Sequence, residues 1–228
     1  MLRYAFSPVP QAALRVAGSD LLFPVRRIYC IGRNYAAHAR EMGHDPDREP
    51  PFFFQKNPDN ICVDGIFPYP AMSNDVHFEI ELAVCLSAGG SDIPESEAQS
   101  CIYGYAVALD MTRRDLQGQA KKMGRPWEIG KSFDLSAPMS EVFRASEIGH
   151  PRSGEIFLDQ NGARRQSGDL AQMIWSVGEQ ISTLSRFFTL APGDVILTGT
   201  PEGVGPVARG DRLHGRVAGV GEIDVTVT

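Results

Sequence analysis

The sequence predicts an α+β fold that is rich in β-strands and has one main helix. Glycine and proline are frequent, with 23 and 16 residues among 228, and they divide the chain into short segments that suit strands and turns. Residues 76–86 alternate apolar and polar side chains as a strand does. Only residues 169–189 keep apolar side chains at helical spacing over a long stretch, with Asp169 as the expected N-cap.

The remaining elements follow from local patterns. Thr112 is the expected N-cap of a helix over residues 112–124, because Asp115 stands three positions later as in a capping box. In chain order we expect strands and turns in a short extension over 1–25, a strand before Gly32, a helical turn at 33–43, a flexible loop at 41–51, and strands at 51–56, 76–86, 101–110, 192–198 and, as a pair, in 210–228.

Composition excludes several classes of protein. The net charge is −6 and the Lys and Arg residues form no run, which argues against a nucleic-acid surface. No apolar stretch approaches the ~20 residues of a membrane helix, and we expect no signal peptide. The four cysteines show no CxxC spacing, so we expect no thiolate metal site and a reducing, cytoplasmic location.

Three carboxylates suggest a metal site. Glu79 and Glu81 share one face of the predicted strand, roughly 6–7 Å apart, and Asp110 ends another apolar strand. Carboxylates that close repel one another unless a cation lies between them, and oxygen ligands favour Mg²⁺, Mn²⁺ or Ca²⁺ over zinc. The alternatives are a solvated strand face for Glu79 and Glu81, and a helix-entry role for Asp110.

His38 and Glu41 suggest a general base. At positions i and i+3 they share one side of a helical turn, where a carboxylate can orient an imidazole and raise its basicity. The alternative is an ordinary contact on a surface helix. Gly32 before the turn and the proline-rich loop after it favour a segment that opens and closes over a site.

Taken together, five stretches resemble the fumarylacetoacetate hydrolase family. They are GRNYAAHAREMG, HFEIELAV, YGYAVALDMTRRDLQ, GKSFDLSAPMS and LTGTPEGVG, in the family's order. The segment REMGHDPDREPPFFFQK further resembles the branch that cleaves acylpyruvates, particularly the fumarylpyruvate hydrolases of gentisate breakdown. One departure is Asn57 between Lys56 and Pro58, where relatives usually have Lys-Pro, and it concerns the shape of the local loop.

The resemblance implies a β-sandwich roll like the family's C-terminal domain, with one main packed helix and a short lid helix. It implies a catalytic domain over 26–228, a homodimer and a small diketo acid as substrate. Carried over by position, the metal ligands are Glu79, Glu81 and Asp110; the catalytic residues are His38, Glu41 and Lys131; and the substrate-binding residues are Arg33, Arg114, Gln117 and Thr200. Taken singly, Arg114 and Lys131 would be surface charges, Gln117 a solvated helix residue and Thr200 a turn former.

The implied reaction is hydrolysis of the C–C bond of an acylpyruvate, with fumarylpyruvate giving fumarate and pyruvate as the preferred case. A water activated by His38 would attack the distal carbonyl, and a bound Mg²⁺ or Mn²⁺ would stabilise the departing enolate of pyruvate. Decarboxylation of oxaloacetate and an isomerase or hydratase acting on unsaturated keto acids stay open. A catalytically silent metal-binding module is the alternative outside the enzymes.

Overall fold

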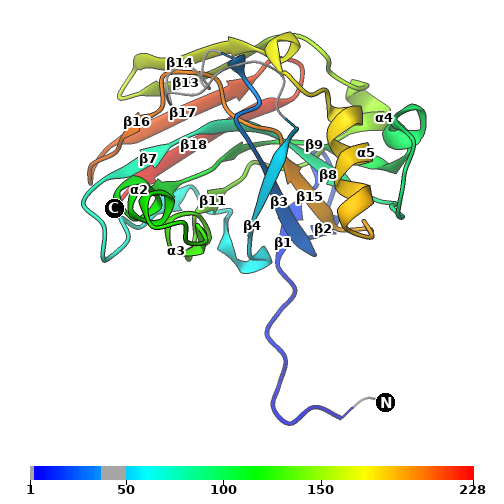
Figure 1. Cartoon of the computed structure of the whole chain (residues 1–228), viewed down its shortest axis with the longest axis horizontal. Coiled ribbons are helices and arrows are strands. Elements are labelled where there is room, and N and C mark those ends of the chain that lie inside the picture. Colours follow the sequence, from blue (N-terminus) through cyan, green and yellow to red (C-terminus); the bar gives the residue numbers. More distant parts are fainter. Residues whose placement is uncertain (1–2, 37–49) are drawn as a thin grey trace.

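Two β-sheets lie face to face in the computed structural model, which describes residues 3–36 and 50–228 (Figure 1). The first has the strand order β12-β9-β8-β15-β3-β4 and the second β14-β13-β17-β18-β6. The strands of the first sheet are β3 (Arg27–Gly32), β4 (Phe52–Lys56), β8 (Ile80–Leu86), β9 (Ile102–Leu109), β12 (Phe143–Arg144) and β15 (Asp194–Leu197). Those of the second are β6 (Ile66–Phe67), β13 (Glu155–Gln160), β14 (Ala163–Asp169), β17 (Arg212–Val217) and β18 (Gly221–Val227).

Smaller elements complete the described part of the chain. The short strands are β1 (Ala13–Arg15), β2 (Leu22–Pro24), β5 (Ile61–Cys62), β7 (Val76–Phe78), β10 (Thr112–Arg113), β11 (Ala137–Pro138) and β16 (Gly205–Pro206). The α-helices are α2 (Arg114–Lys122), α3 (Glu128–Lys131), α4 (Ala145–Ile148) and α5 (Val177–Phe187), and the 3₁₀ helices are η1 (Pro58–Asn60), η2 (Glu95–Cys101) and η3 (Leu170–Gln172). None of the helices in these described ranges is long and apolar enough to cross a membrane.

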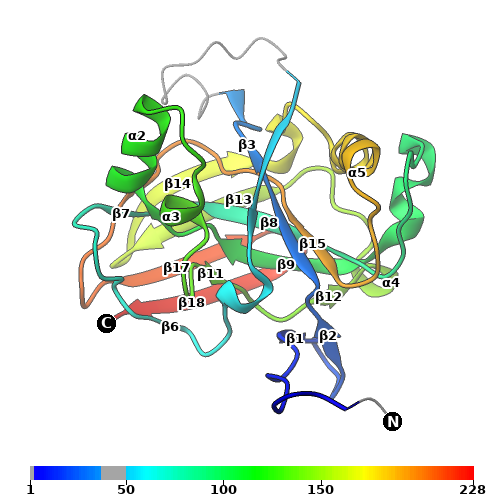
Figure 2. The same cartoon turned by 60° about the horizontal axis from the view of Figure 1, so that its bottom comes forward.

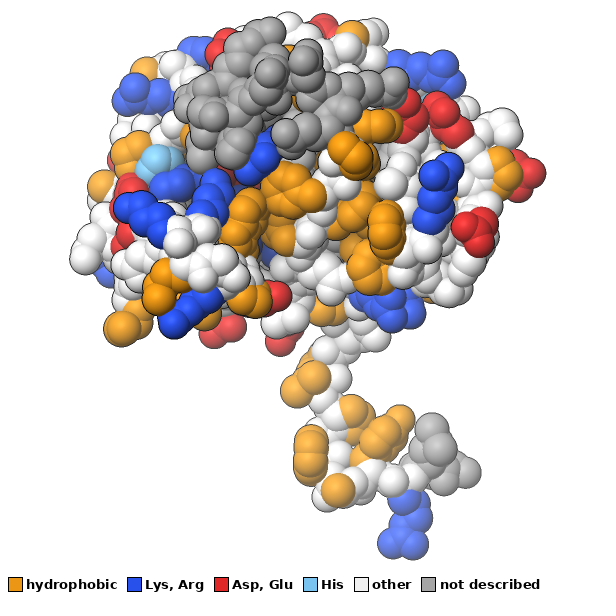
Figure 3. Space-filling model, viewed as in Figure 1, with side chains coloured by type: hydrophobic (Ala, Val, Ile, Leu, Met, Phe, Trp, Pro, Cys, Tyr) orange, Lys and Arg blue, Asp and Glu red, His pale blue; other side chains and the backbone are white. Residues whose placement is uncertain are grey.

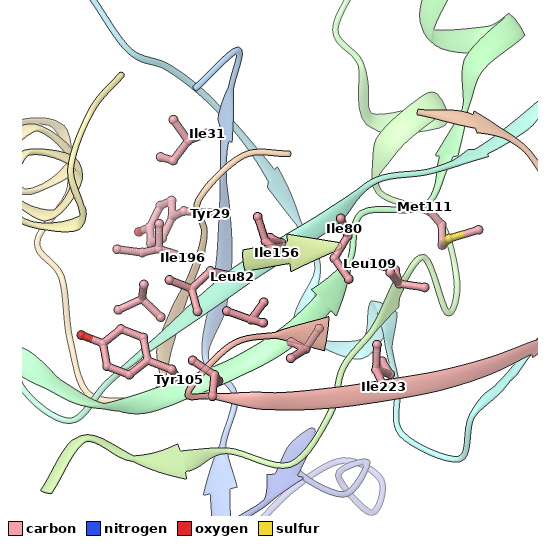
Figure 4. Packing of buried hydrophobic residues seen from close by; sticks show 14 of the residues in the cluster. Tyr29, Ile31, Ile80, Leu82, Tyr105, Leu109, Met111, Ile156, Ile196 and Ile223 are labelled. Carbon is pink, nitrogen blue, oxygen red and sulfur yellow. The ribbon is translucent and has the colours of Figure 1, made fainter. Parts of the chain in front are cut away.

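The main hydrophobic core lies between the two sheets and under α5. Figure 4 shows Leu82, Leu109 and Ile196 of the first sheet beside Ile156 and Ile223 of the second. All five side chains are buried, which is the burial expected where two sheets interdigitate. The predicted inward face of β7 and β8 is confirmed, because every second residue from 78 to 84 lies in this core.

A second, smaller core covers the opposite face of the six-stranded sheet. Leu14 and Phe23 of the β1–β2 hairpin belong to one buried cluster with Cys30, Ala83 and other small residues of that sheet. Figure 2 shows the hairpin near the start of β3. Strands β3, β8, β9 and β15 are therefore buried on both faces over most of their length. A carboxylate or a lysine on this second face is enclosed unless it lies beside a pocket.

The predicted α+β, strand-rich fold with one main helix is confirmed, but two helix starts were wrong. The main helix begins at Val177 rather than at 169, because Ser176 and Glu179 form a capping box there; Asp169 caps η3 instead. Thr112 is not an N-cap, because it lies in β10 and its hydroxyl donates to the carbonyl of Asp110. Of the predicted lid helix over 33–43, residues 37–43, which include His38 and Glu41, lie outside the described residues.

Candidate active site

The antiparallel pairing of β8 with β9 brings the three predicted metal ligands together. Ile80 pairs with Leu109, and just beyond this pair the Asp110 amide donates to the Glu79 carbonyl at 2.8 Å. Glu79, Glu81 and Asp110 each offer a carboxylate oxygen within 4.8 Å of those of the other two, and all three residues are buried. The alternative of a solvated strand face for Glu79 and Glu81 is therefore wrong.

A pocket opens beside these carboxylates. Its walls come from the end of β3, from β4, from the helices α2 and α3, and from the loop after β15. The lining residues are Ile31, Gly32, Arg33, Phe52, Phe54, Glu79, Glu81, Asp110, Arg114, Gln117, Lys121, Trp127, Lys131 and Thr200. All eight of the predicted site residues that lie within the described ranges are among them.

Lys131 forms ion pairs with two of the acids. Its Nζ lies 2.8 Å from Glu79 Oε2 and 2.7 Å from Asp110 Oδ2, and the side chain is buried. Burial alone would lower the pKa of Lys131, but the charges of Asp110 and Glu79 outweigh it and raise that pKa. Lys131 therefore places a positive charge at the pocket wall beside these acids.

Helix α3 ends at Lys131 and reaches this position because of a glycine. A Cβ on Gly130 would lie 2.9 Å from the backbone nitrogen of Gln117, closer than real Cβ contacts. The glycine therefore lets α3 lie directly against α2. The same contact sets Gln117 and Lys131 beside one pocket.

Arg114 and Gln117 on α2 are joined to each other and to the acids. The Arg114 guanidinium pairs with Glu79 and donates to Gln117 Oε1, the latter at 2.9 Å. Arg114 therefore neutralises an acid as well as facing the pocket. Thr200 is buried, and its hydroxyl accepts a hydrogen bond from Gln166 Nε2 at 2.8 Å.

Arg33 has an unusual backbone conformation. Its φ of 59° lies in the left-handed region, which a residue other than glycine rarely adopts and which is common at functional sites. Its guanidinium carbon lies 5.2 Å from the centroid of the Phe52 ring. His38 and Glu41 lie outside the described residues, so their geometry stays a prediction.

Lys56 is a site residue that the sequence reasoning missed. The end of β4 places its Nζ 2.9 Å from Asp110 Oδ1, and this buried ammonium also donates to the carbonyl of Met111 and to Ser136 Oγ at 3.2 and 3.0 Å. In the sequence, Lys56 was noted only because Asn57 separates it from Pro58, a departure that concerns the local loop. The available signal was a charged residue at the end of a strongly apolar strand, where burial requires a partner.

The three acids fit a divalent cation. Asp110 Oδ1 is buried and accepts no hydrogen bond of good geometry from the described residues, although Lys56 Nζ is near. Glu81 accepts from the amide of Gly199 at 2.6 Å, and burial followed by the charges of Asp110 and Glu79 raises its pKa well above its usual range. An ion among these oxygens would keep all three acids ionised, and oxygen donors suit Mg²⁺, Mn²⁺ or Ca²⁺.

A larger groove of about 560 Å³ lies elsewhere, between η2, α5 and the segment after α4. Glu95, Gln99, His150 and Arg152 are among its lining residues. Within the described ranges, its lining includes none of the predicted site residues and no second cluster of acids. The chemistry therefore belongs to the smaller pocket.

Comparison with known proteins identifies the family. The model of the fumarylacetoacetate (FAA) hydrolase C-terminal family matches residues 27–228. The chain belongs to the fumarylacetoacetate hydrolase family. The predicted family and the predicted fold are thus both confirmed.

Individual relatives carry two kinds of name. A fumarylpyruvate hydrolase of Pseudomonas aeruginosa, solved with Mn²⁺ and pyruvate, is 52% identical, with a TM-score of 0.97 and 99% of both chains covered. A fumarylpyruvate hydrolase of Ralstonia sp is 42% identical over 82% of this chain and 98% of its own. An oxaloacetate tautomerase of Escherichia coli (strain K12) is 44% identical over 86% of this chain and 90% of its own. The prediction of a hydrolase is confirmed, and the substrate has to be argued separately.

Proposed function

We propose that this protein hydrolyses the C–C bond of an acylpyruvate, with fumarylpyruvate, cleaved to fumarate and pyruvate, as the best candidate. The observation that carries the proposal is the cluster of three buried carboxylates beside Lys131 in one pocket. The similarity to a fumarylpyruvate hydrolase solved with Mn²⁺ and pyruvate supports it. Gentisate breakdown, a form of aromatic catabolism, would supply such a substrate.

In this proposal Glu79, Glu81 and Asp110 hold one Mg²⁺ or Mn²⁺, with Ca²⁺ as a further candidate. The bound ion would supply positive charge next to the oxygens of the pyruvate half of the substrate. Lys131, already fixed by two ion pairs in the pocket wall, adds a second positive charge for the developing negative charge. Glu81 is held in place by the Gly199 amide, so the acid does not have to reorient during the reaction.

His38 is the proposed general base and Glu41 the group that orients it. His38 takes a proton from water, and the resulting hydroxide attacks the carbonyl distal to the keto acid. The C–C bond then breaks, the acyl half leaves as a carboxylic acid, and the pyruvate half leaves as an enolate that takes up a proton. Gln117 and Thr200 are proposed to contact the substrate, and Arg33 and Arg114 to provide charge for its carboxylates.

The test is pyruvate release from a panel of keto acids: fumarylpyruvate, maleylpyruvate, acetylpyruvate, fumarylacetoacetate and oxaloacetate. We expect fumarylpyruvate to be cleaved fastest, EDTA to stop the release, and added Mn²⁺ to restore it. His38→Ala should abolish cleavage without changing Mn²⁺ binding. Faster consumption of oxaloacetate than of every diketo acid would contradict the proposal, and a silent metal-binding module would release no pyruvate under either condition.

Oxaloacetate tautomerisation is a second candidate, because a relative with that name is 44% identical. Tautomerisation moves one proton between carbon and oxygen, breaks no C–C bond and needs no attacking water. It can therefore be separated from hydrolysis and from decarboxylation, since only the last two produce pyruvate. The loss of the enol absorbance of oxaloacetate without pyruvate release would support this candidate.

We further propose a homodimer in the cytoplasm. Residues 3–11 extend away from the two sheets (Figures 1 and 2), and Phe6 and Val9 in this segment are 82% and 87% exposed, which favours contact with a second copy.

The four cysteines are free and buried, which suits a reducing compartment. Residues 26–228 would form the catalytic unit and 1–25 its extension. Light scattering should give the mass of a dimer for the wild type and of a monomer for Phe6→Asp; a monomeric wild type contradicts the proposal.

A further inference from the structure

Lys121 stands apart from the acids of the described chain. Four Lys and Arg side chains line the pocket: Arg33, Arg114, Lys121 and Lys131. Arg114 pairs with Glu79, and Lys131 pairs with Glu79 and Asp110. Lys121 forms no ion pair with any carboxylate in residues 3–36 or 50–228.

Helix α2 carries Lys121 on the same face as the other substrate-facing residues. Arg114, Gln117 and Lys121 are separated by three and four positions, which sets them in one row along a helix. Arg114 lies at the carboxylate end of the pocket, next to Glu79. Lys121 is two turns further along the row, so it lies away from the metal ligands.

An aromatic wall leads to Lys121. Its Nζ is 5.0 Å from the centroid of the Trp127 ring, and that ring contacts Phe52 and Phe54 with centroid distances of 5.3 and 5.8 Å. All three rings line the pocket. A flat, unsaturated chain can lie along such a surface. Figure 3 shows Lys and Arg side chains beside hydrophobic ones on the face where α2 lies.

The electrostatic environment of Lys121 favours an incoming anion. Burial and then the positive charges of Arg114, Arg33 and Lys131 lower the pKa of Lys121, and the charge of Glu79 opposes them. The ammonium is half-buried among like charges. A carboxylate placed beside it would offset this repulsion and gain a charge-assisted hydrogen bond.

We propose that Lys121 binds the second carboxylate of a substrate that has one carboxylate at each end. The substrate class is then a dicarboxylic acylpyruvate whose unsaturated acyl chain lies along Phe52, Phe54 and Trp127. This inference rests on the proposed function and adds the residue that selects the acyl group. Arg33, which also lines the pocket, can share the same carboxylate.

The experiment compares two substrates in three variants. Fumarylpyruvate has the second carboxylate and acetylpyruvate lacks it, and kcat/KM is measured for both. Lys121→Met keeps the stem that contacts Trp127 but removes the charge; Lys121→Arg restores the charge; Lys122→Met removes the charge of the exposed neighbour. Because a hydrogen bond to a charged group contributes about 1.5–3 kcal/mol, we expect the fumarylpyruvate to acetylpyruvate ratio of kcat/KM to fall about 10- to 100-fold in Lys121→Met, chiefly through KM.

The ratio should return to within about threefold of the wild type in Lys121→Arg and stay unchanged in Lys122→Met. An equal loss for both substrates in Lys121→Met would mean that Lys121 only supports the fold, and an unchanged ratio would mean that another group binds the carboxylate. Either result overturns the inference while leaving the proposed function intact. A wild-type enzyme that cleaves neither substrate overturns the proposed function itself.

Discussion

Replacing Glu81 by glutamine tests whether the three acids form a cation site. In the absence of metal, Glu81 is a buried acid whose pKa is raised by burial and by Asp110 and Glu79. The folded chain therefore keeps this proton at pH values where the unfolded chain has lost it. The resulting stabilisation is present below the ordinary pKa of about 4.5 and is lost as the pH rises through the raised pKa of the folded state. Glu81→Gln introduces an uncharged amide that does not titrate, so the variant does not lose this stabilisation as the pH rises.

Two results follow for Glu81→Gln. In EDTA the variant should gain stability relative to the wild type as the pH rises from about 5 to about 8. With bound metal the wild type should be more stable than Glu81→Gln. A ligand at 100 times its Kd stabilises by about 2.7 kcal/mol, and a chain of 228 residues gains about 2–4 °C in Tm per kcal/mol, so Mn²⁺ should raise the wild-type Tm by about 5–11 °C. A hundredfold loss of affinity in the variant would leave about 0.4 kcal/mol, or about 1–2 °C.

Differential scanning fluorimetry in EDTA and with Mn²⁺ measures both results. Glu202→Gln is the matched control, because Glu202 is exposed in the loop after Thr200 and should behave as the wild type. Equal Mn²⁺ shifts in wild type and Glu81→Gln would refute the cation site. A variant that is less stable than the wild type in EDTA at about pH 8 would refute the reasoning about the buried charge.

Two further substitutions test the surroundings of the acids. Lys56→Met should cost about 3–5 kcal/mol in urea unfolding, because it removes the buried cation beside Asp110 Oδ1 and leaves only Lys131 of the described residues paired with this acid. Exposed Lys122→Met should stay within about 0.5 kcal/mol, and a similar cost for both variants would contradict the role of Lys56. Gly199→Ala should cost about 1–3 kcal/mol of stability, because Gly199 has a φ of 98° and a Cβ there would lie 2.7 Å from Asn34 Cβ. It should also weaken Mn²⁺ binding, because the Gly199 amide donates to Glu81. An unchanged Tm and an unchanged Mn²⁺ shift would argue against this constraint.

Strand pattern carried most of the fold prediction. Alternation in 76–86 identified β7 and β8, and the apolar run ending at Asp110 identified β9. The helix starts failed because two capping signals compete over a few residues. Asp169 has the sequence of an N-cap and does cap η3, but Ser176 with Glu179 caps the main helix, and only the packed structure decides between them.

The site was partly predictable from sequence, because some of its residues lie on one strand and others meet only in the folded chain. Glu79 and Glu81 lie on one strand, so their proximity follows from strand geometry. Asp110 was joined to them through the family resemblance, because its proximity depends on the pairing of β8 with β9, a register across 31 positions of the chain that strand pattern alone does not give. For Lys56 the only signal was a charge at the end of an apolar strand, and Lys121 had no signal, because their roles depend on Asp110 just after β9 and on Trp127 just before α3.

Identity to relatives does not by itself choose between the candidate reactions, since fumarylpyruvate hydrolases match at 52% and 42% and an oxaloacetate tautomerase matches at 44%. Each reaction acts on a 2-keto acid and gains from positive charge beside its oxygens, so Glu79, Glu81, Asp110 and Lys131 would serve both equally. Only hydrolysis needs a base that activates water and a subsite for the acyl group. The functional assignment therefore depends on His38 rather than on the acids, and a protein in which His38 can be replaced without loss of acylpyruvate cleavage does not use the proposed hydrolytic mechanism. Lys121 decides only which acyl group is preferred.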